Sequence, residues 1–185
     1  MIRVITLRLY GQRIVGTAPP GNPPPDIELE VWESPRDKDV SWHLDGLRRF
    51  RDGQVCAVAR HDKEVAAYCW LAYTPIPVAE IDRVVVPAAD EVYLYDAFTV
   101  PAWRGRGLFT LMLRHLLAYA RSQGRRRALI FAEARNLPSC RAIERAGFEI
   151  FQTVVRLDVL GFTRQWSRGR PPQASRITLV DARRL

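Results

Sequence analysis

Cysteine and histidine are scarce in this sequence, which contains three of each among 185 residues. The cysteines are too few and too scattered for a disulfide framework, and no pair of them has the spacing of metal ligands. The histidines are likewise isolated from one another along the chain. We therefore expect free thiols and no metal site. The residues concerned are Cys56, Cys69, Cys140, His43, His61 and His115.

Long apolar runs are also lacking, and the longest ones are far shorter than a membrane-spanning helix requires. The first sixteen residues alternate apolar and polar side chains. This alternation predicts a strand, whereas a secretory signal has a continuous apolar core followed by a small-residue cleavage site. These features favour a cytoplasmic protein that does not enter a membrane.

Acidic residues are outnumbered, with 20 Asp and Glu against 28 Lys and Arg, which gives a formal net charge of +8. Such an excess favours the binding of anions, but it does not distinguish among nucleic acid, an anionic membrane and a phosphate-rich cofactor. Part of the excess lies at residues 125–127 and part in the C-terminal tail. A solvated basic surface is the simpler interpretation of both clusters.

Prolines interrupt the chain at residues 18–26 and 170–173, and a residue without a backbone donor cannot continue a strand ladder. We therefore predict three parts. An N-terminal strand and proline-rich linker occupy residues 1–26, one domain occupies residues 27–165, and a basic tail with a candidate strand occupies residues 166–185.

The central part reads as strands alternating with helices. Apolar residues recur at helical spacing over residues 39–50, 108–122 and 138–146. Residues 73–90 are interpreted as irregular. The strand–helix–strand unit over residues 104–132 has the length of a parallel crossover. We therefore predict an α+β fold in which helices flank a mixed sheet. The strands are predicted over residues 27–32, 55–59, 64–72, 91–100, 128–132 and 148–159.

The most specific signal is the stretch FTVPAWRGRGLFTLML at residues 98–113. Pro101 ends a strand, and two glycines lead directly into an amphipathic helix. The first amides of a helix have no intrahelical acceptor and lie at the positive end of its dipole, so this turn suits a pyrophosphate. A P-loop is excluded because no Gly-Lys-Ser/Thr follows. The dinucleotide fingerprint is excluded because Thr110 stands where its third glycine belongs.

Two blocks of sequence together resemble a known family. Residues 104–109, RGRGLF, resemble the Q/R-x-x-G-x-G/A acetyl-CoA motif of the GCN5-related N-acetyltransferase (GNAT) superfamily. Residues 136–148, NLPSCRAIERAGF, resemble that family's N-x-x-S-x-x-x-Y-E-K-x-G-F segment, and one strand separates the blocks as the family requires. The resemblance implies a mostly antiparallel twisted sheet with a splayed central strand pair. It also implies an N-acetyltransferase in which a primary amine attacks acetyl-CoA directly.

The same resemblance implies a coenzyme A site, residue by residue. The amides of residues 106–109 would hold the pyrophosphate, and Arg104 would organise their loop. The pantetheine arm would enter between the ends of the two splayed strands. Asn136 would bind that arm, and Ser139 would lie near it at the start of the next helix. The implied cofactor-binding residues are Phe98, Thr99, Val100, Arg104, Gly105, Arg106, Gly107, Leu108, Phe109, Asn136 and Ser139.

Acetyl transfer requires a neutral amine, so a positioned base is useful. Asp96 is the best candidate, because a carboxylate in mid-strand is uncommon unless it is satisfied or used. Strict alternation would place it on the face of Val92 and Leu94. A structural aspartate that accepts hydrogen bonds is an equally good interpretation.

Ile143 stands where many family members carry the tyrosine that protonates the departing thiolate. Ser139 and Cys140 are therefore candidate catalytic acids, although capping and packing are the commoner roles of such residues. Water could also supply the proton, since a thiolate is a fairly stable leaving group with a reference thiol pKa of about 8.5.

Three alternatives stay open at this point. A basic nucleic-acid-binding module would explain the charge, but no recognition motif for nucleic acid is present. A non-catalytic relative that only binds acyl-CoA would explain Ile143. An acyltransferase for longer acyl chains would share both motifs. The acceptor, a small molecule or a peptide amine, is not readable from the sequence, and family habit suggests a homodimer, with the candidate strand at residues 176–180 as one guess for its interface.

Overall fold

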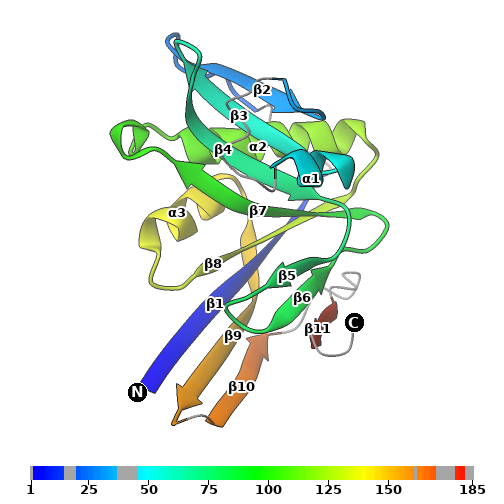
Figure 1. The fold of residues 1–185 in the computed structure, drawn as a ribbon, viewed down its shortest axis with the longest axis vertical. Helices are drawn as coiled ribbons and strands as arrows, with labels where there is room; N and C mark the ends of the chain where they lie inside the picture. The colour runs from blue at the N-terminus through cyan, green and yellow to red at the C-terminus, as the bar shows by residue number, and fades with distance from the viewer. Residues whose placement is uncertain (1, 15–19, 37–45, 161, 170–177, 182–185) are drawn as a thin grey trace.

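The computed structural model describes residues 2–14, 20–36, 46–160, 162–169 and 178–181. Its main sheet contains eight strands (Figure 1), and only one neighbouring pair in it, β7 with β8, is parallel. The predicted α+β fold with a mixed, mostly antiparallel sheet is therefore confirmed. In spatial order the strands are β10 (Phe162–Gly169), β9 (Glu149–Val159), β1 (Ile2–Arg13), β8 (Arg127–Glu133), β7 (Glu91–Thr99), β4 (Glu64–Ala72), β3 (Val55–His61) and β2 (Glu28–Trp32).

Helices cover both faces of this sheet. On one face lie α2 (Leu108–Ser122) and α3 (Leu137–Arg145), and α1 (Gly46–Arg51) lies on the other, in front of the strands in Figure 1. A second, three-stranded sheet packs on this other face. It consists of β11 (Thr178–Asp181), β6 (Arg83–Val86) and β5 (Ile76–Val78).

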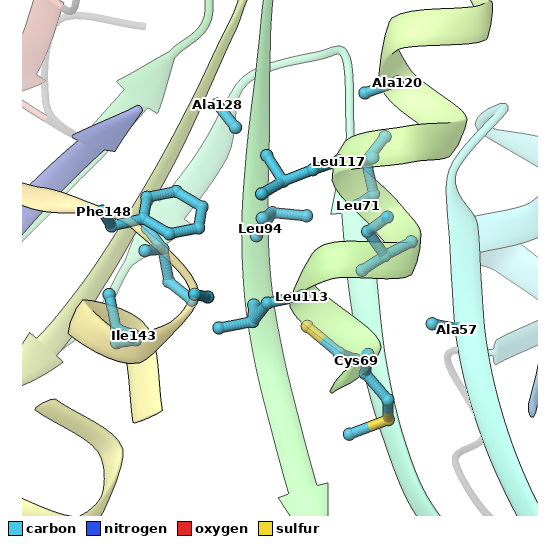
Figure 2. Close-up of a cluster of buried hydrophobic side chains, with 14 of the residues drawn as sticks. Ala57, Cys69, Leu71, Leu94, Leu113, Leu117, Ala120, Ala128, Ile143 and Phe148 are labelled. Carbon is cyan, nitrogen blue, oxygen red and sulfur yellow. The ribbon is translucent and has the colours of Figure 1, made fainter. Parts of the chain in front are cut away.

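The longest helix, α2, forms because apolar side chains recur every three or four residues along one face. Figure 2 shows its Leu113 and Leu117 pointing toward Leu94 of β7. The strands beneath contribute small side chains such as Ala57 and Cys69, so the helix packs close to the sheet. Gly124 ends the helix with a left-handed φ of 73°, as the sequence predicts for a C-terminal cap.

The N-terminal strand lies inside the sheet rather than beside it. β1 pairs with β8 from Leu7 to Arg13 and with β9 from Ile2 to Gly11. Its side chains alternate between the two cores, with Leu7 in one and Tyr10 in the other, and both are fully buried. β1 is an integral strand of the main sheet, although it belongs to the N-terminal part that we predicted from the sequence. The predicted domain boundaries at residues 26 and 165 stay predictions.

Three strands were not expected from the sequence. Residues 73–90, interpreted as irregular, contain β5 and β6, which are short, and Pro77 lies within β5. β10 occupies part of the predicted tail. Its side chains are mostly exposed and many are polar, so they lack the apolar alternation by which a strand is predicted. β11 pairs with β6 of the same chain, so the strand we had considered for a dimer is engaged within the molecule. Of the helix predicted over residues 39–50, residues 39–45 lie outside the described ranges.

The interior place of β1 makes a stability prediction. Leu7→Ala removes a side chain that is 0% exposed and should lower the free energy of unfolding by about 3 kcal/mol. Ile2→Ala, on the same strand where the side chain is 70% exposed, should change it by less than about 0.5 kcal/mol. Urea unfolding of both variants measures the difference. Equal, small effects would mean that β1 does not belong to the core.

Candidate functional site

The parallel pair β7–β8 opens partway along its length. The strands pair from Glu91 with Arg127 to Leu94 with Ile130, and the pairing stops there. Beyond that point β7 still pairs with β4, and β8 still pairs with β1. Residues 95–99 and 131–133 therefore face each other without a shared ladder. This separation is the splayed strand pair that the family resemblance implies.

A β-bulge in β7 lies at the opening. Tyr95 pairs with Trp70 and Phe98 pairs with Tyr68, so β7 carries one extra residue between these two pairs. Asp96 has a φ of 45° there, which few non-glycine residues adopt. Residues 96–98 are exposed although β7 is an interior strand of the sheet. An open surface is thus built into the middle of the sheet.

The bulge makes one of our predictions wrong. Strict alternation put Asp96 on the α2 face with Val92 and Leu94, which do lie in the core under α2. The Asp96 carboxylate instead accepts a hydrogen bond from Arg49, a residue of α1 on the opposite face. The extra residue and the left-handed φ turn the side chain out of the alternating pattern.

Arg49 and Asp96 form an ion pair at the edge of the exposed surface. Their side chains are 17% and 34% exposed, respectively. The guanidinium also lies 5.1 Å from the ring centre of Trp70 and 5.2 Å from that of Tyr95, within the range of cation–π attraction. The arginine is therefore held by two aromatic rings as well as by the carboxylate.

Two tyrosine hydroxyls beside this pair stay protonated at neutral pH. Burial is the main cause that raises the pKa of Tyr95 to about 12, and the nearby charge of Asp96 acts in the same direction. Burial, followed by the Asp96 charge, also raises the pKa of Tyr68 to about 12. The Tyr95 hydroxyl donates a hydrogen bond to Gln54. Both groups can serve as neutral hydrogen-bonding groups, and neither is suited to be a base.

On the α2 face, the glycine-rich turn leads into the helix as the sequence predicts. Gly105 and Gly107 have φ values of 78° and 76°, which glycine adopts without strain. A Cβ atom built on either would meet nothing within 4 Å, so the space above the turn is open. In the described part of the chain, no hydrogen bond uses the amides of residues 105–110, and the first one of the helix is Leu111 N to Gly107 O at 3.1 Å. A series of unpaired backbone amide donors therefore lies beside open space.

Side chains brace this turn against its surroundings. Arg104 donates from Nε to the carbonyl oxygen of Thr99 at 3.1 Å, and so ties the turn to the end of β7. Arg106 packs over the ring of Trp103 at 4.4 Å and lies 3.5 Å from a carboxylate oxygen of Asp26. Both guanidiniums add positive charge beside the unpaired amides.

A cavity of about 590 Å³ adjoins the turn. Three arginines line it, one each from the turn, from the middle of α2 and from the end of α3. The last two are linked, because Arg114 donates to the carbonyl oxygen of Arg145 at 2.9 Å. The cavity is therefore positively charged and suits an anionic ligand. Its lining consists of Asn22, Pro23, Pro24, Arg106, Gly107, Thr110, Leu111, Arg114 and Arg145.

The second motif forms the start of α3. The side-chain oxygen of Asn136 accepts a hydrogen bond from the amide of Ser139 at 3.3 Å, so Asn136 caps the helix. Its side-chain nitrogen makes no hydrogen bond within the described ranges, and the residue is exposed. Ser139 lies half-buried in the first turn. Their predicted roles in binding the cofactor arm stay predictions.

The two residues considered in place of the missing tyrosine differ in their environment. Cys140 is buried, and its Sγ lies 3.5 Å from the carbonyl oxygen of Glu133 at the end of β8. Tyr10 of β1 lies beside it, and burial raises the pKa of that tyrosine. Ile143 is 1% exposed and points into the core with Phe148 (Figure 2). The position at which the family resemblance implies a tyrosine hydroxyl is thus filled by a packed side chain here.

Several residues of this site have no signal in the sequence. Arg49 lies 47 positions from Asp96, and no motif connects the two. Arg114 and Arg145 lie on helices whose polar residues read as ordinary exposed positions. Only the packing of α1 against β7, and of α3 against α2, brings these side chains to the site.

Two classes of site find no support in the described residues. No three histidine, cysteine or acidic side chains gather closely enough there to hold a metal ion. Within the same ranges, no helix has the length and apolar character needed to cross a bilayer.

Comparison with known proteins identifies the family. The family described as "Acetyltransferase (GNAT) family" matches residues 22–148. No curated protein matches the chain significantly.

Solved structures share the fold at low sequence identity. A GCN5-related N-acetyltransferase from Sphaerobacter thermophilus has a TM-score of 0.58 at 13% identity, with 85% of this chain and 52% of that chain covered. A GNAT-family protein from Novosphingobium aromaticivorans has a TM-score of 0.58 at 20% identity, with 83% and 63% covered. A tandem GNAT protein from the clavulanic acid biosynthesis pathway has a TM-score of 0.60 at 13% identity, with 92% and 55% covered. This chain therefore spans less than two thirds of each of these proteins.

The cap at the start of α3 allows a test of what the Asn136 hydrogen bond contributes to stability. Asn136→Ala removes the accepting oxygen and should lower the free energy of unfolding by about 1 kcal/mol. Asn136→Asp keeps an oxygen in the same place and should preserve stability. Thermal or urea unfolding measures both variants. If Asn136→Ala is as stable as the parent, the capping bond contributes nothing.

Proposed function

This chain belongs to the GNAT acetyltransferase family, and on that premise we propose that it transfers the acetyl group of acetyl-CoA to an amine. The observation that supports this most is the combination of a glycine turn with unpaired amides and a sheet that opens beside it. The turn provides donors for the pyrophosphate, and the opening provides a slot for an extended chain. Both lie within the segment that matches the family.

The residues present fit coenzyme A at its charged end. The unpaired amides of residues 105–110 and the open space above both glycines match a diphosphate. Arg106 is shared between this turn and the arginine-lined cavity. We assign the nucleotide end of the cofactor to that cavity, where Arg114 and Arg145 would pair with its phosphates.

The slender pantetheine arm fits the opening between β7 and β8. Phe98, Thr99 and the facing end of β8 would flank it, and their backbone groups lack a shared ladder across the gap. The arm carries amides of its own, so it can bond these groups as an added strand would. When bound, the cofactor supplies the acetyl group as a thioester.

The acceptor amine approaches from the α1 face. The glycine turn leads into α2 on one face, whereas the Arg49–Asp96 pair lies on the other. The amine nitrogen forms the new amide bond as the carbon–sulfur bond breaks, and the sulfur leaves with the electron pair. Asp96 receives the first proton, which the ammonium group loses before it attacks. The nitrogen loses a second proton as the amide forms, and the departing thiolate gains one, relayed through water, Ser139 or Cys140, so that the relay group is restored.

A second candidate function is binding of acyl-CoA without catalysis. The specific observation in its favour is Ile143, which is packed in the core and has no hydroxyl to donate. This candidate and the enzyme share the cofactor site and differ in turnover alone. Release of free thiol from acetyl-CoA across a panel of amines distinguishes them.

The cofactor site is tested by placing a carboxylate at the turn. Gly107→Glu should weaken binding of coenzyme A at least 100-fold, because the new charge faces the pyrophosphate. Gly124→Glu is the matched control, since Gly124 has a similar φ of 73°, has no neighbour within 4 Å of a Cβ atom and lies at the other end of α2. Calorimetric titration with coenzyme A measures both variants. Unchanged binding to Gly107→Glu would remove the turn from the site.

The role of Asp96 is tested by the pH dependence of turnover. Asp96→Asn cannot accept the proton of the ammonium group, so its kcat/KM should fall at least 10-fold at pH values below the pKa of the amine. The difference should shrink at higher pH, where the amine is already neutral. Release of free thiol from acetyl-CoA, measured at a series of pH values, gives the profile of kcat/KM for the parent and for Asp96→Asn. Profiles of the same shape would exclude Asp96 as the proton acceptor.

A further inference from the structure

β10 forms one edge of the main sheet (Figure 1). In the part of the chain that the structure describes, it pairs with β9 on one side and has no strand on the other. All of its residues pair with β9 in one unbroken register, and none of them is a proline, a lysine or an acidic residue. Such an edge can take a further strand from another chain, because its outward backbone groups have no partner among the described strands.

The side chains of β10 divide between a face that is engaged within the chain and a face that is exposed. On the first face, Gln165 donates from Nε2 to the carbonyl oxygen of Ile81 at 3.4 Å. The Thr163 hydroxyl donates to a carboxylate oxygen of Asp158 at 2.6 Å. These bonds hold the strand against the rest of the molecule. The exposed face carries aromatic rings and guanidiniums in alternation, namely Phe162, Arg164, Trp166 and Arg168.

This exposed face of β10 lacks internal partners. Phe162 and Trp166 are 81% and 47% exposed, although large aromatic side chains are usually covered. Within the described ranges, neither Arg164 nor Arg168 makes a hydrogen bond or an ion pair. A guanidinium is attracted to the face of an aromatic ring, so the edge favours a partner strand that places a ring opposite each arginine.

A second copy of β10 is such a partner. Two identical strands can pair antiparallel about a two-fold axis normal to the sheet, and the side chains that then face each other lie on the same face. With the axis at Gln165, Arg164 lies opposite Trp166 of the second copy. In the same register, Phe162 lies opposite Arg168 of the second copy. The symmetry repeats these contacts on the other side of the axis, so every guanidinium on this face meets a ring.

Other registers of the same pairing are less favourable. With the axis at Arg164, this guanidinium lies opposite its own copy. With the axis at Trp166, Arg164 lies opposite Arg168 of the second copy. Like charges that lie directly opposite destabilise a strand pair. Moving the axis farther along β10 leaves fewer residues to pair. The axis at Gln165 therefore gives the longest pairing without opposed charges.

We propose that this chain forms a two-fold symmetric homodimer in which the β10 strands of two copies pair antiparallel about Gln165. The two main sheets then continue into each other, and the ring–guanidinium contacts select the register. β9 and β1 separate this edge from β8, so the opening between β7 and β8 stays accessible in each copy. The inference does not depend on the proposed acetyltransferase function.

Charge reversal across the interface tests the proposal. The dissociation constant of the dimer is measured by analytical ultracentrifugation of the full chain. Trp166→Arg places a guanidinium opposite Arg164 of the second copy, and should raise Kd at least 10-fold. Adding Arg164→Glu to Trp166→Arg restores opposite charges at these positions and should return Kd to within about 3-fold of the parent value. Ile150→Arg is the control, because Ile150 is 46% exposed on β9, which is not an edge strand, and it should leave Kd unchanged.

A disulfide test measures the register directly. In the proposed dimer the two Gln165→Cys positions lie opposite each other with Cα atoms about 5 Å apart, a separation that a disulfide spans. The two Ser167→Cys positions lie about 13 Å apart, which is too far. Mild oxidation should link Gln165→Cys into a dimer on a non-reducing gel and leave Ser167→Cys unlinked. The native cysteines are buried and should not contribute.

The outcomes are distinct. A chain that stays monomeric up to about 100 μM overturns the inference. A dimer that Trp166→Arg does not weaken overturns it as well, as does a double variant that associates no more tightly than Trp166→Arg alone. Repair in the double variant supports it and shows that Trp166→Arg still folds. Linking of Ser167→Cys without linking of Gln165→Cys contradicts the register. None of these measurements uses thiol release, so this inference and the proposed function fail separately.

Discussion

The divergence of β7 from β8 beyond Leu94 is the constraint on which the rest of the site depends. Each of the two strands keeps a partner on its outer side, β4 for one and β1 for the other, so they separate without leaving the sheet. The position of β1 is essential here, because β1 still pairs with β8 over the residues of β8 that no longer pair with β7. The result is an opening between the two faces of a sheet that is otherwise continuous.

The opening assigns different chemistry to the two faces. On one face, α2 presents its first amides and nearby arginines, which favour an anion. On the other, the bulge at Asp96 turns a carboxylate toward α1, although a left-handed φ in a non-glycine residue costs about 1–3 kcal/mol. The ion pair with Arg49 and its packing against Trp70 offset that cost. In the function that we propose, the phosphate-rich cofactor and the acceptor amine approach from opposite sides and meet at the thioester.

Local patterns predicted the parts of the site that depend on local physics. The helix at residues 108–122 was predicted from apolar spacing and has those bounds, and the glycine turn before it followed from sequence alone. Alternation placed Val92 and Leu94 correctly but failed at Asp96, because an extra residue in a strand has no signature in a single sequence. Short strands such as β5 exist because β6 and β11 pair beside them, and the Arg49–Asp96 pair depends on packing between distant segments.

We propose that coenzyme A binds at the turn before α2 with its arm in the opening between β7 and β8. Following backbone amide signals by nuclear magnetic resonance while coenzyme A is added tests it most directly. We expect the largest shifts at Gly105 to Phe109, which hold the diphosphate, and at Phe98 and Thr99, which flank the arm. Saturable binding that leaves these amides unchanged and shifts others instead would contradict the claim.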